Sequence, residues 1–241
     1  MKTTTKKSTP VKAAPTKKAT AKKAAPTKKA AAKKKPSKKA SDETTEIVCV
    51  LDRSTSIHTS GLTEKTIEGF NSFLNEQKQL PGKAKLTLCL FDGGMGYRKY
   101  TLFLFDGEMG YRNSGLENKT YEIIYDRVDI KEVEELNNKT FVPKGMTAMY
   151  DAIGVTIDNV YKQLKASKKK SDRVIFLIMT DGEENSSREY DQKTVLKLIE
   201  DRQKKDKWAF LFIGANIDTM KAGGGMGISK GNTMAYSNSG V

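Results

Sequence analysis

Three short segments carry hydroxyl and carboxylate side chains in a pattern suited to binding a hard metal ion. The segment DRSTS places Asp52, Ser54 and Ser56 at alternate positions, directly after an apolar run. Thr147 lies in GMTAMYDAIG, and Asp181 lies in TDG. Mg²⁺ takes six oxygen ligands in octahedral geometry, and Mn²⁺ also suits oxygen donors. These five side chains therefore predict a site for Mg²⁺ or Mn²⁺.

Each segment also has an ordinary structural interpretation. Ser54 and Ser56 could form a turn, Thr147 could cap a helix, and Asp181 with Gly182 is a common turn pair. The metal site is favoured because the ligand types agree across all three segments. Their expected position in the fold agrees as well.

That position follows from an alternation of apolar runs and helical patterns along the chain. Strands are predicted at Glu46–Leu51, Lys85–Phe91, Tyr121–Tyr125, Val174–Met179 and Trp208–Ile213, and helices at 62–80, 149–164 and 190–204. Because the strands are apolar throughout, we expect an α/β domain with a Rossmann-like, doubly wound and mostly parallel sheet. Ligands of such sheets bind beyond the carboxyl ends of the strands, where Asp52 and Asp181 would lie.

Together the three segments resemble the metal-ion-dependent adhesion site of the von Willebrand factor type A (VWA) family. The family pattern is Asp-x-Ser-x-Ser after the first strand, a distant Thr, and an Asp after the fourth strand. The matching residues of this chain are Asp52, Ser54, Ser56, Thr147 and Asp181. The resemblance covers roughly residues 45–230.

The resemblance implies that the three hydroxyls bind the ion directly, while the two carboxylates act mostly through water. It also implies an open coordination position, which an Asp or Glu of a partner protein fills. On this interpretation the domain is a binding module and not an enzyme, because no catalytic base stands beside the site.

Other sites fit the sequence less well. A phosphatase of the haloacid dehalogenase type would have a second Asp at position 54, where this chain has Ser. The Gly-rich stretch Lys221–Asn232 matches neither common nucleotide-binding motif. His58 is the sole histidine and is interpreted as a loop residue, and no Cys/His cluster predicts zinc.

The positive charge of the chain is concentrated at its N-terminus. The whole chain has 43 Lys and Arg against 29 Asp and Glu, a net charge of +14. Residues 1–40 contain 15 Lys and no acidic residue, which leaves 28 basic and 29 acidic residues for the rest. Without large apolar side chains after Val11, and with four prolines, residues 1–43 are predicted to be a disordered tail.

This tail resembles the lysine-rich tails of linker histones and suggests non-specific contact with nucleic acid or another polyanion. Lysines that neutralise phosphates release counterions, which gives sequence-independent and salt-sensitive affinity. A solubilising tail or a nuclear address are the alternatives. The candidate contact residues are Lys17, Lys18, Lys22, Lys23, Lys28, Lys29, Lys33, Lys34, Lys35, Lys38 and Lys39.

The remaining residues, 44–241, are predicted to form a single VWA-like domain with one departure from the family pattern. The sequence TLCLFDGGMGYRKY at residues 87–100 is followed at once by the near-copy TLFLFDGEMGYRNS at residues 101–114. Either copy could take the strand position in the core, and the other could add a hairpin at the edge of the sheet or loop out.

Composition also suggests a location. Cys49 and Cys89 lie in apolar runs, so no disulfide framework is expected and a reducing compartment is the simpler expectation. The chain contains no apolar run long enough to span a membrane and no secretory signal pattern. We therefore expect an intracellular protein of the cytoplasm or nucleoid, or of the nucleus in a eukaryote.

The leading functional hypothesis is a metal-dependent adaptor that captures an acidic residue of an unknown partner and is tethered to a polyanion by its tail. One alternative is a nucleic-acid packaging or nucleoid-associated protein in which the tail dominates. Another is a non-catalytic subunit of a chelatase-type ATPase assembly. The ATPase would then have to be another chain.

Overall fold

The computed structural model describes residues 43–94, 100–105, 108–113, 120–167 and 171–236. The predicted tail with its eleven candidate lysines lies outside these residues, apart from Glu43, and so does the run Lys168–Lys170. None of the described helices is both long enough and apolar enough to cross a membrane.

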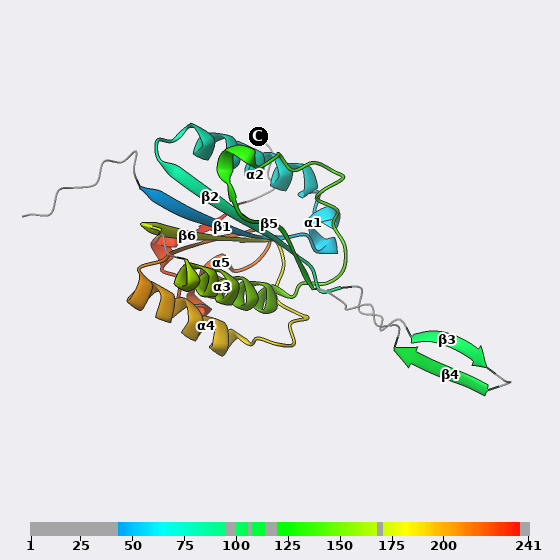
Figure 1. The fold of residues 1–241 in the computed structure, drawn as a ribbon. Coiled ribbons are helices and arrows are strands. Elements are labelled where there is room, and N and C mark those ends of the chain that lie inside the picture. The colour runs from blue at the N-terminus through cyan, green and yellow to red at the C-terminus, as the bar shows by residue number, and fades with distance from the viewer. Residues whose placement is uncertain (1–42, 95–99, 106–107, 114–119, 168–170, 237–241) are drawn as a thin grey trace, which may run out of the picture. The chain divides into compact units, whose positions relative to one another are not determined.

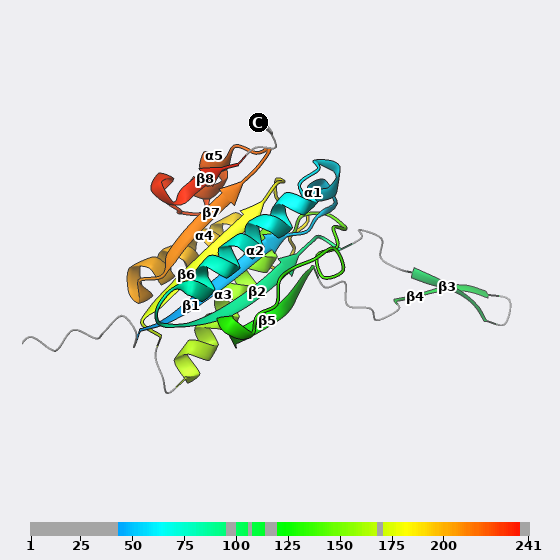
Figure 2. The ribbon, with the colours of Figure 1, turned by 90° about the horizontal axis from the view of Figure 1, so that it is seen from above.

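Six strands form one sheet in the order β5-β2-β1-β6-β7-β8 (Figure 2). β5 runs antiparallel to β2, and the other neighbouring pairs are parallel, so the predicted α/β class with a mostly parallel sheet is confirmed. At one edge of the sheet, β8 pairs in parallel with β7. The strands are β1 (Thr44–Asp52), β2 (Lys83–Phe91), β5 (Tyr121–Asp129), β6 (Arg173–Thr180), β7 (Ala209–Gly214) and β8 (Thr233–Ala235).

Helices cover both faces of this sheet (Figure 1). On one face lie α1 (Thr55–Thr59) and α2 (Thr63–Gln79), and on the other α3 (Met149–Ala166) and α4 (Gln192–Asp201). α4 continues into a π-helical turn over Arg202–Asp206. α5 (Thr219–Gly225) is the short helix of the Gly-rich stretch, and single 3₁₀ turns span Ile130–Glu132 and Lys230–Asn232. α1 was not predicted, and it makes His58 a helical rather than a loop residue.

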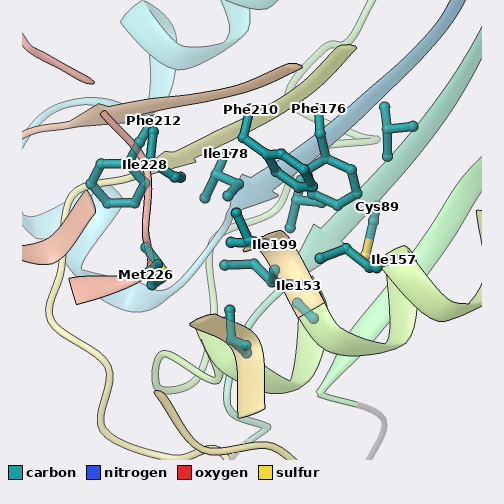
Figure 3. Packing of buried hydrophobic residues seen from close by; sticks show 14 of the residues in the cluster. Cys89, Ile153, Ile157, Phe176, Ile178, Ile199, Phe210, Phe212, Met226 and Ile228 are labelled. Atoms are coloured by element: carbon teal, nitrogen blue, oxygen red, sulfur yellow. The ribbon is translucent and has the colours of Figure 1, made fainter. Parts of the chain in front are cut away.

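Alternation along β1 divides the core into two apolar clusters. Val48 and Val50 pack toward α3 and α4, whereas Ile47, Cys49 and Leu51 pack toward α1 and α2. Figure 3 shows the first cluster, in which the tilted rings of Phe176 in β6 and Phe210 in β7 lie near Ile157 of α3. Because successive strand residues point to opposite faces, both faces of β1 are apolar, as its sequence predicted.

The two cysteines belong to opposite clusters. Cys49 packs on the α2 face and Cys89 on the α3 face, and both are buried free thiols. The sheet therefore lies between the two thiols. This arrangement fits the expectation that they form no disulfide.

The first copy of the repeat occupies the sheet. Thr87–Phe91 forms the last part of β2 and pairs with β1 on one side and β5 on the other. The second copy supplies most of β3 (Tyr100–Phe105) and β4 (Glu108–Asn113), which pair with each other in a separate two-stranded sheet. The possibility of a hairpin at the edge of the six-stranded sheet is therefore wrong: the extra unit forms a hairpin whose strands pair with each other and not with that sheet.

Three sequence differences explain why the first copy is selected. With an offset of 14 residues, Leu86, Cys89 and Gly94 correspond to Tyr100, Phe103 and Glu108. Leu86 and Cys89 are completely buried, so larger aromatic side chains there would overpack the core. Gly94 has φ of 65°, a left-handed conformation that strains a Glu. The second copy therefore fits the core position poorly.

We predict that Cys89→Phe, which places the residue of the second copy in the sheet, lowers the free energy of unfolding by about 1–3 kcal/mol. The reverse change, Phe103→Cys, lies outside the six-stranded sheet and should alter stability by less than about 0.5 kcal/mol. Urea unfolding of both variants measures the difference. Equal effects would show that packing at Cys89 does not select the copy.

Candidate metal centre

The two predicted carboxylates meet at the point where the connections of the sheet diverge. β1 and β6 are adjacent, and the chain proceeds from β1 to β2 on one side and from β6 to β7 on the other. Ligand crevices in doubly wound sheets form at such a switch point. Asp52 ends β1 and Asp181 directly follows β6, so both stand at this edge, as their sequence positions predicted.

Hydrogen bonds join the first and third segments into one network. Asp52 Oδ1 accepts a bond of 2.7 Å from the Ser54 amide, and its Oδ2 accepts one of 2.5 Å from the Thr180 hydroxyl. The Ser54 and Ser56 hydroxyl oxygens lie 2.8 Å apart, and Ser56 Oγ donates to Asp181 Oδ1 at 2.7 Å. The alternate spacing of the serines thus places both hydroxyls between the two carboxylates.

Thr147 reaches the same place from the irregular segment before α3. Its backbone amide donates to the side-chain Oδ1 of Asn185 at 2.9 Å, and its carbonyl accepts from the backbone amide of Asn185 at 3.0 Å. A Cβ built on Gly182 would lie 3.3 Å from Ser56 Oγ and 3.4 Å from Thr147 Oγ1, so both hydroxyls border one point. The helix-capping alternative is wrong for Thr147, because Ala148 is the N-cap residue of α3.

Burial makes both carboxylates costly to ionise. Desolvation raises the pKa of Asp52 to about 6, against the opposing effect of hydrogen bonds from Thr180 and Ser54. Desolvation likewise raises the pKa of Asp181, against the hydrogen bonds from Ser56 and Ser60. Asp181 Oδ2 is buried without a hydrogen-bond partner. A divalent cation at this position would offset both costs.

The donor set fits Mg²⁺ or Mn²⁺ better than a softer metal. It combines two carboxylates with three neutral hydroxyls, all hard oxygen donors. Across the described part of the chain, no group of three or more His, Cys, Asp and Glu side chains is placed to hold a metal ion. A metal here would therefore depend on the hydroxyls of Ser54, Ser56 and Thr147.

A buried ion pair, which was not predicted from the sequence, supports the candidate site. Arg53 Nε donates to Asp92 Oδ2 at 3.0 Å and Nη1 donates to Glu122 Oε2 at 2.9 Å. The Arg53 carbonyl accepts from the Lys144 amide at 2.8 Å. Arg53 thus ties the end of β1 to the end of β2 and to the segment that carries Thr147. The available signal was a charged residue directly after each apolar strand, at Arg53 and Asp92.

Asp151 shapes the loop after Asp181, and sequence reasoning missed it too. Its carboxylate accepts three backbone amides, from Arg188, Glu189 and Tyr190, each at 2.8 Å. This loop lies against the first turn of α3. The third predicted segment is therefore held to the second by a side chain whose role is visible only in three dimensions.

Glu184 makes a second set of such contacts in the same loop. Its Oε2 accepts from the Tyr150 amide at 2.9 Å, and its Oε1 accepts from the Ser186 and Ser187 amides at 2.8 and 2.7 Å. The loop is thus fixed at both ends by carboxylates that bind backbone amides. Asn185, which holds Thr147, lies between these contacts.

No family model matches the sequence, and no curated protein matches it. Among solved structures, two crystal forms of proximal thread matrix protein 1 from the mussel byssus align at 12% identity with TM-scores of 0.47 and 0.48. They cover 83% and 81% of this chain and 42% of their own. The manganese-loaded Plasmodium vivax TRAP protein aligns at 17% identity with a TM-score of 0.45, over 79% of this chain and 65% of its own.

This chain therefore spans less than half the length of the mussel protein. Likenesses of this size assign neither a family nor a function. The structure is that of an α/β protein with a six-stranded sheet. At the switch point of this sheet lies an oxygen-rich polar site in which Asp181 Oδ2 has no hydrogen-bond partner.

We predict that Mg²⁺ or Mn²⁺ raises the unfolding temperature of the full chain and that EDTA reverses the rise. Asp181→Asn removes a buried charge, so without metal this variant should be at least as stable as the parent, but it should lose the metal-induced rise. Asp218→Asn is the matched control, because Asn also serves as the N-cap of α5. A parent that does not respond to either ion would contradict the assignment.

Proposed function

We propose that the chain is a divalent-metal-dependent protein-binding module. Mg²⁺ or Mn²⁺ would be held by the side chains of Asp52, Ser54, Ser56, Thr147 and Asp181. The observation that carries the proposal is the hydrogen-bonded path from Asp52 through both serines to Asp181, together with the unpartnered Asp181 oxygen. The resemblance of the three segments to the VWA adhesion site supports the same assignment.

The chemistry of this donor set suits capture of an acidic partner. The three hydroxyl ligands are neutral, and the family resemblance implies that the two carboxylates act mostly through water. The directly bound side chains would then leave most of the positive charge of the ion uncompensated. A carboxylate from an Asp or Glu of another protein would then complete the octahedral shell. The chain's own residues orient the ion and bind; we assign them no catalytic step.

The tail would serve a separate role, as a tether to nucleic acid or another polyanion. It joins the domain at the start of β1, whereas Asp52 ends that strand. Nine residues of strand separate these points by roughly 27 Å, so one chain could hold a polyanion and a protein partner together. We further propose that the protein acts inside the cell, which the two buried free thiols support.

A packaging protein remains the competing hypothesis because 15 lysines fall within residues 1–40. Deleting residues 1–40 separates the two functions. A packaging protein would lose all binding, whereas the adaptor would keep its protein partner. The chelatase-subunit hypothesis would require an ATPase from another chain among the captured proteins.

We predict that the full chain retains a protein from nuclease-treated source lysate in Mg²⁺ but not in EDTA. Asp52→Ala should abolish this retention, because it removes the carboxylate that orients Ser54. Asp126→Asn, an exposed change away from the site, should retain the partner. If Asp52→Ala retains as much of the partner as the parent chain does, the site assignment is wrong.

For the tail, we predict that affinity for a double-stranded DNA oligomer falls steeply with added salt, since each neutralised phosphate releases a counterion. Replacing the eleven candidate lysines by Gln should remove most of the affinity and its salt dependence. Fluorescence anisotropy over a range of salt concentrations measures both. A flat salt response would exclude the tail from this role.

A further inference from the structure

The segment directly before Thr147 exposes apolar side chains to solvent beside the candidate metal centre. Val142 and Met146 are 50% and 43% exposed, although both are large and apolar. Lys144, between them, is also exposed, whereas Pro143 and Gly145 are half-buried. We call Val142, Lys144 and Met146 the rim stripe.

The rim stripe is held in place by the core. Val133, Leu136 and Phe141 lie earlier in the same segment and are buried in the cluster on the α2 face. The side chain of Asn71 in α2 makes two hydrogen bonds to the backbone of Leu136. Asn71 Oδ1 accepts from the Leu136 amide at 2.8 Å, and Asn71 Nδ2 donates to the Leu136 carbonyl at 2.9 Å. The exposure of Val142 is therefore not the fraying of a loose loop, because its neighbour Phe141 is completely buried.

Backbone hydrogen bonds fix the stripe against the site itself. The Lys144 amide donates to the Arg53 carbonyl at 2.8 Å, and the Thr55 amide donates to the Gly145 carbonyl at 3.1 Å. These two contacts stand on either side of Ser54. The Met146 carbonyl accepts from the Gly93 amide at 2.5 Å, and the next residue is Thr147. The stripe thus borders the hydroxyls that would hold the ion.

Charge and polarity of the stripe indicate what it would bind. Apolar surface beside a polar site commonly marks a contact surface for a partner. The metal ion and the Lys144 ammonium both attract carboxylates, whereas Val142 and Met146 favour aliphatic or aromatic side chains. Met also adapts its shape to different apolar partners. One occupant meets all of these demands: a protein segment with an acidic residue next to an apolar one.

We propose that the rim stripe selects the partner segment, by taking an apolar side chain adjacent to the Asp or Glu that binds the metal. This inference rests on the proposed metal-dependent capture and adds the residue class that flanks the captured carboxylate. Specificity would come from the stripe, because an ion alone binds any accessible carboxylate.

The test uses short synthetic peptides that differ at three positions, Leu-Asp-Leu, Ser-Asp-Ser or Leu-Asn-Leu, with the full chain immobilised. In Mg²⁺ we expect the Leu-Asp-Leu peptide to bind about tenfold more tightly than Ser-Asp-Ser, a difference of about 1.4 kcal/mol. The Leu-Asn-Leu peptide, and every peptide in EDTA, should bind weakly.

Two double variants show whether the stripe causes the preference. Val142→Ser with Met146→Ser should reduce it to less than about twofold, since little apolar contact would remain. Met220→Ser with Met234→Ser is the matched control, because these side chains are 46% and 63% exposed on α5 and β8. An unchanged rise of the unfolding temperature with Mg²⁺ would show that each variant keeps the metal centre.

The possible failures are distinguishable. Equal metal-dependent binding of the two Asp peptides would overturn the stripe inference and leave the proposed function standing. No metal-dependent binding of either Asp peptide would overturn both. Self-association of the chain that the stripe variant abolishes would assign the surface to a second copy, and would also overturn the inference.

Discussion

The candidate metal centre depends on two carboxylates held at the ends of neighbouring buried strands. Asp52 and Asp181 are removed from water by the same sheet that aligns them, and this burial raises the pKa of both groups. Hydrogen bonds from Ser54, Ser56 and Thr180 reduce the cost but leave Asp181 Oδ2 without a partner. A site this polar and incompletely satisfied is a place where a cation would stabilise the fold.

The loops at this edge must hold the carboxylates and hydroxyls in place. Further charged residues fix these loops. Arg53 connects the ends of β1 and β2, and Asp151 and Glu184 bind backbone amides of the loop after β6. These groups need not touch an ion to matter. They hold Ser54, Ser56 and Thr147 in one arrangement, so that little ordering remains to be done when a ligand binds.

The two ends of β1 divide the proposed roles. The lysine-rich tail precedes Thr44 and would act through charge alone, so its sequence could be simple. The proposed metal centre at Asp52 would act through geometry, with residues from three distant segments. A specificity surface on the rim stripe fits this division, because backbone hydrogen bonds to Arg53, Thr55 and Gly93 hold the stripe in a fixed position beside the site.

The amino-acid sequence is enough to predict a mostly parallel sheet, its two apolar faces and five polar side chains at one edge. These features follow from local sequence patterns. An apolar run followed by a carboxylate indicates the end of a buried strand, and apolar residues at helical spacing indicate the helices that connect the strands. The charge separation between tail and domain is equally local, as the count of lysines in residues 1–40 shows.

Three features depend on packing in three dimensions: which repeat copy enters the sheet, how Thr147 reaches the serines, and what the buried Arg53 contacts. Both copies have the same strand pattern, and the choice depends on the space around Cys89 and the backbone conformation of Gly94. The pairing of Arg53 with Asp92 joins residues 39 positions apart. Volumes and long-range contacts of this kind arise from the packing of distant segments, which no local pattern in the chain records.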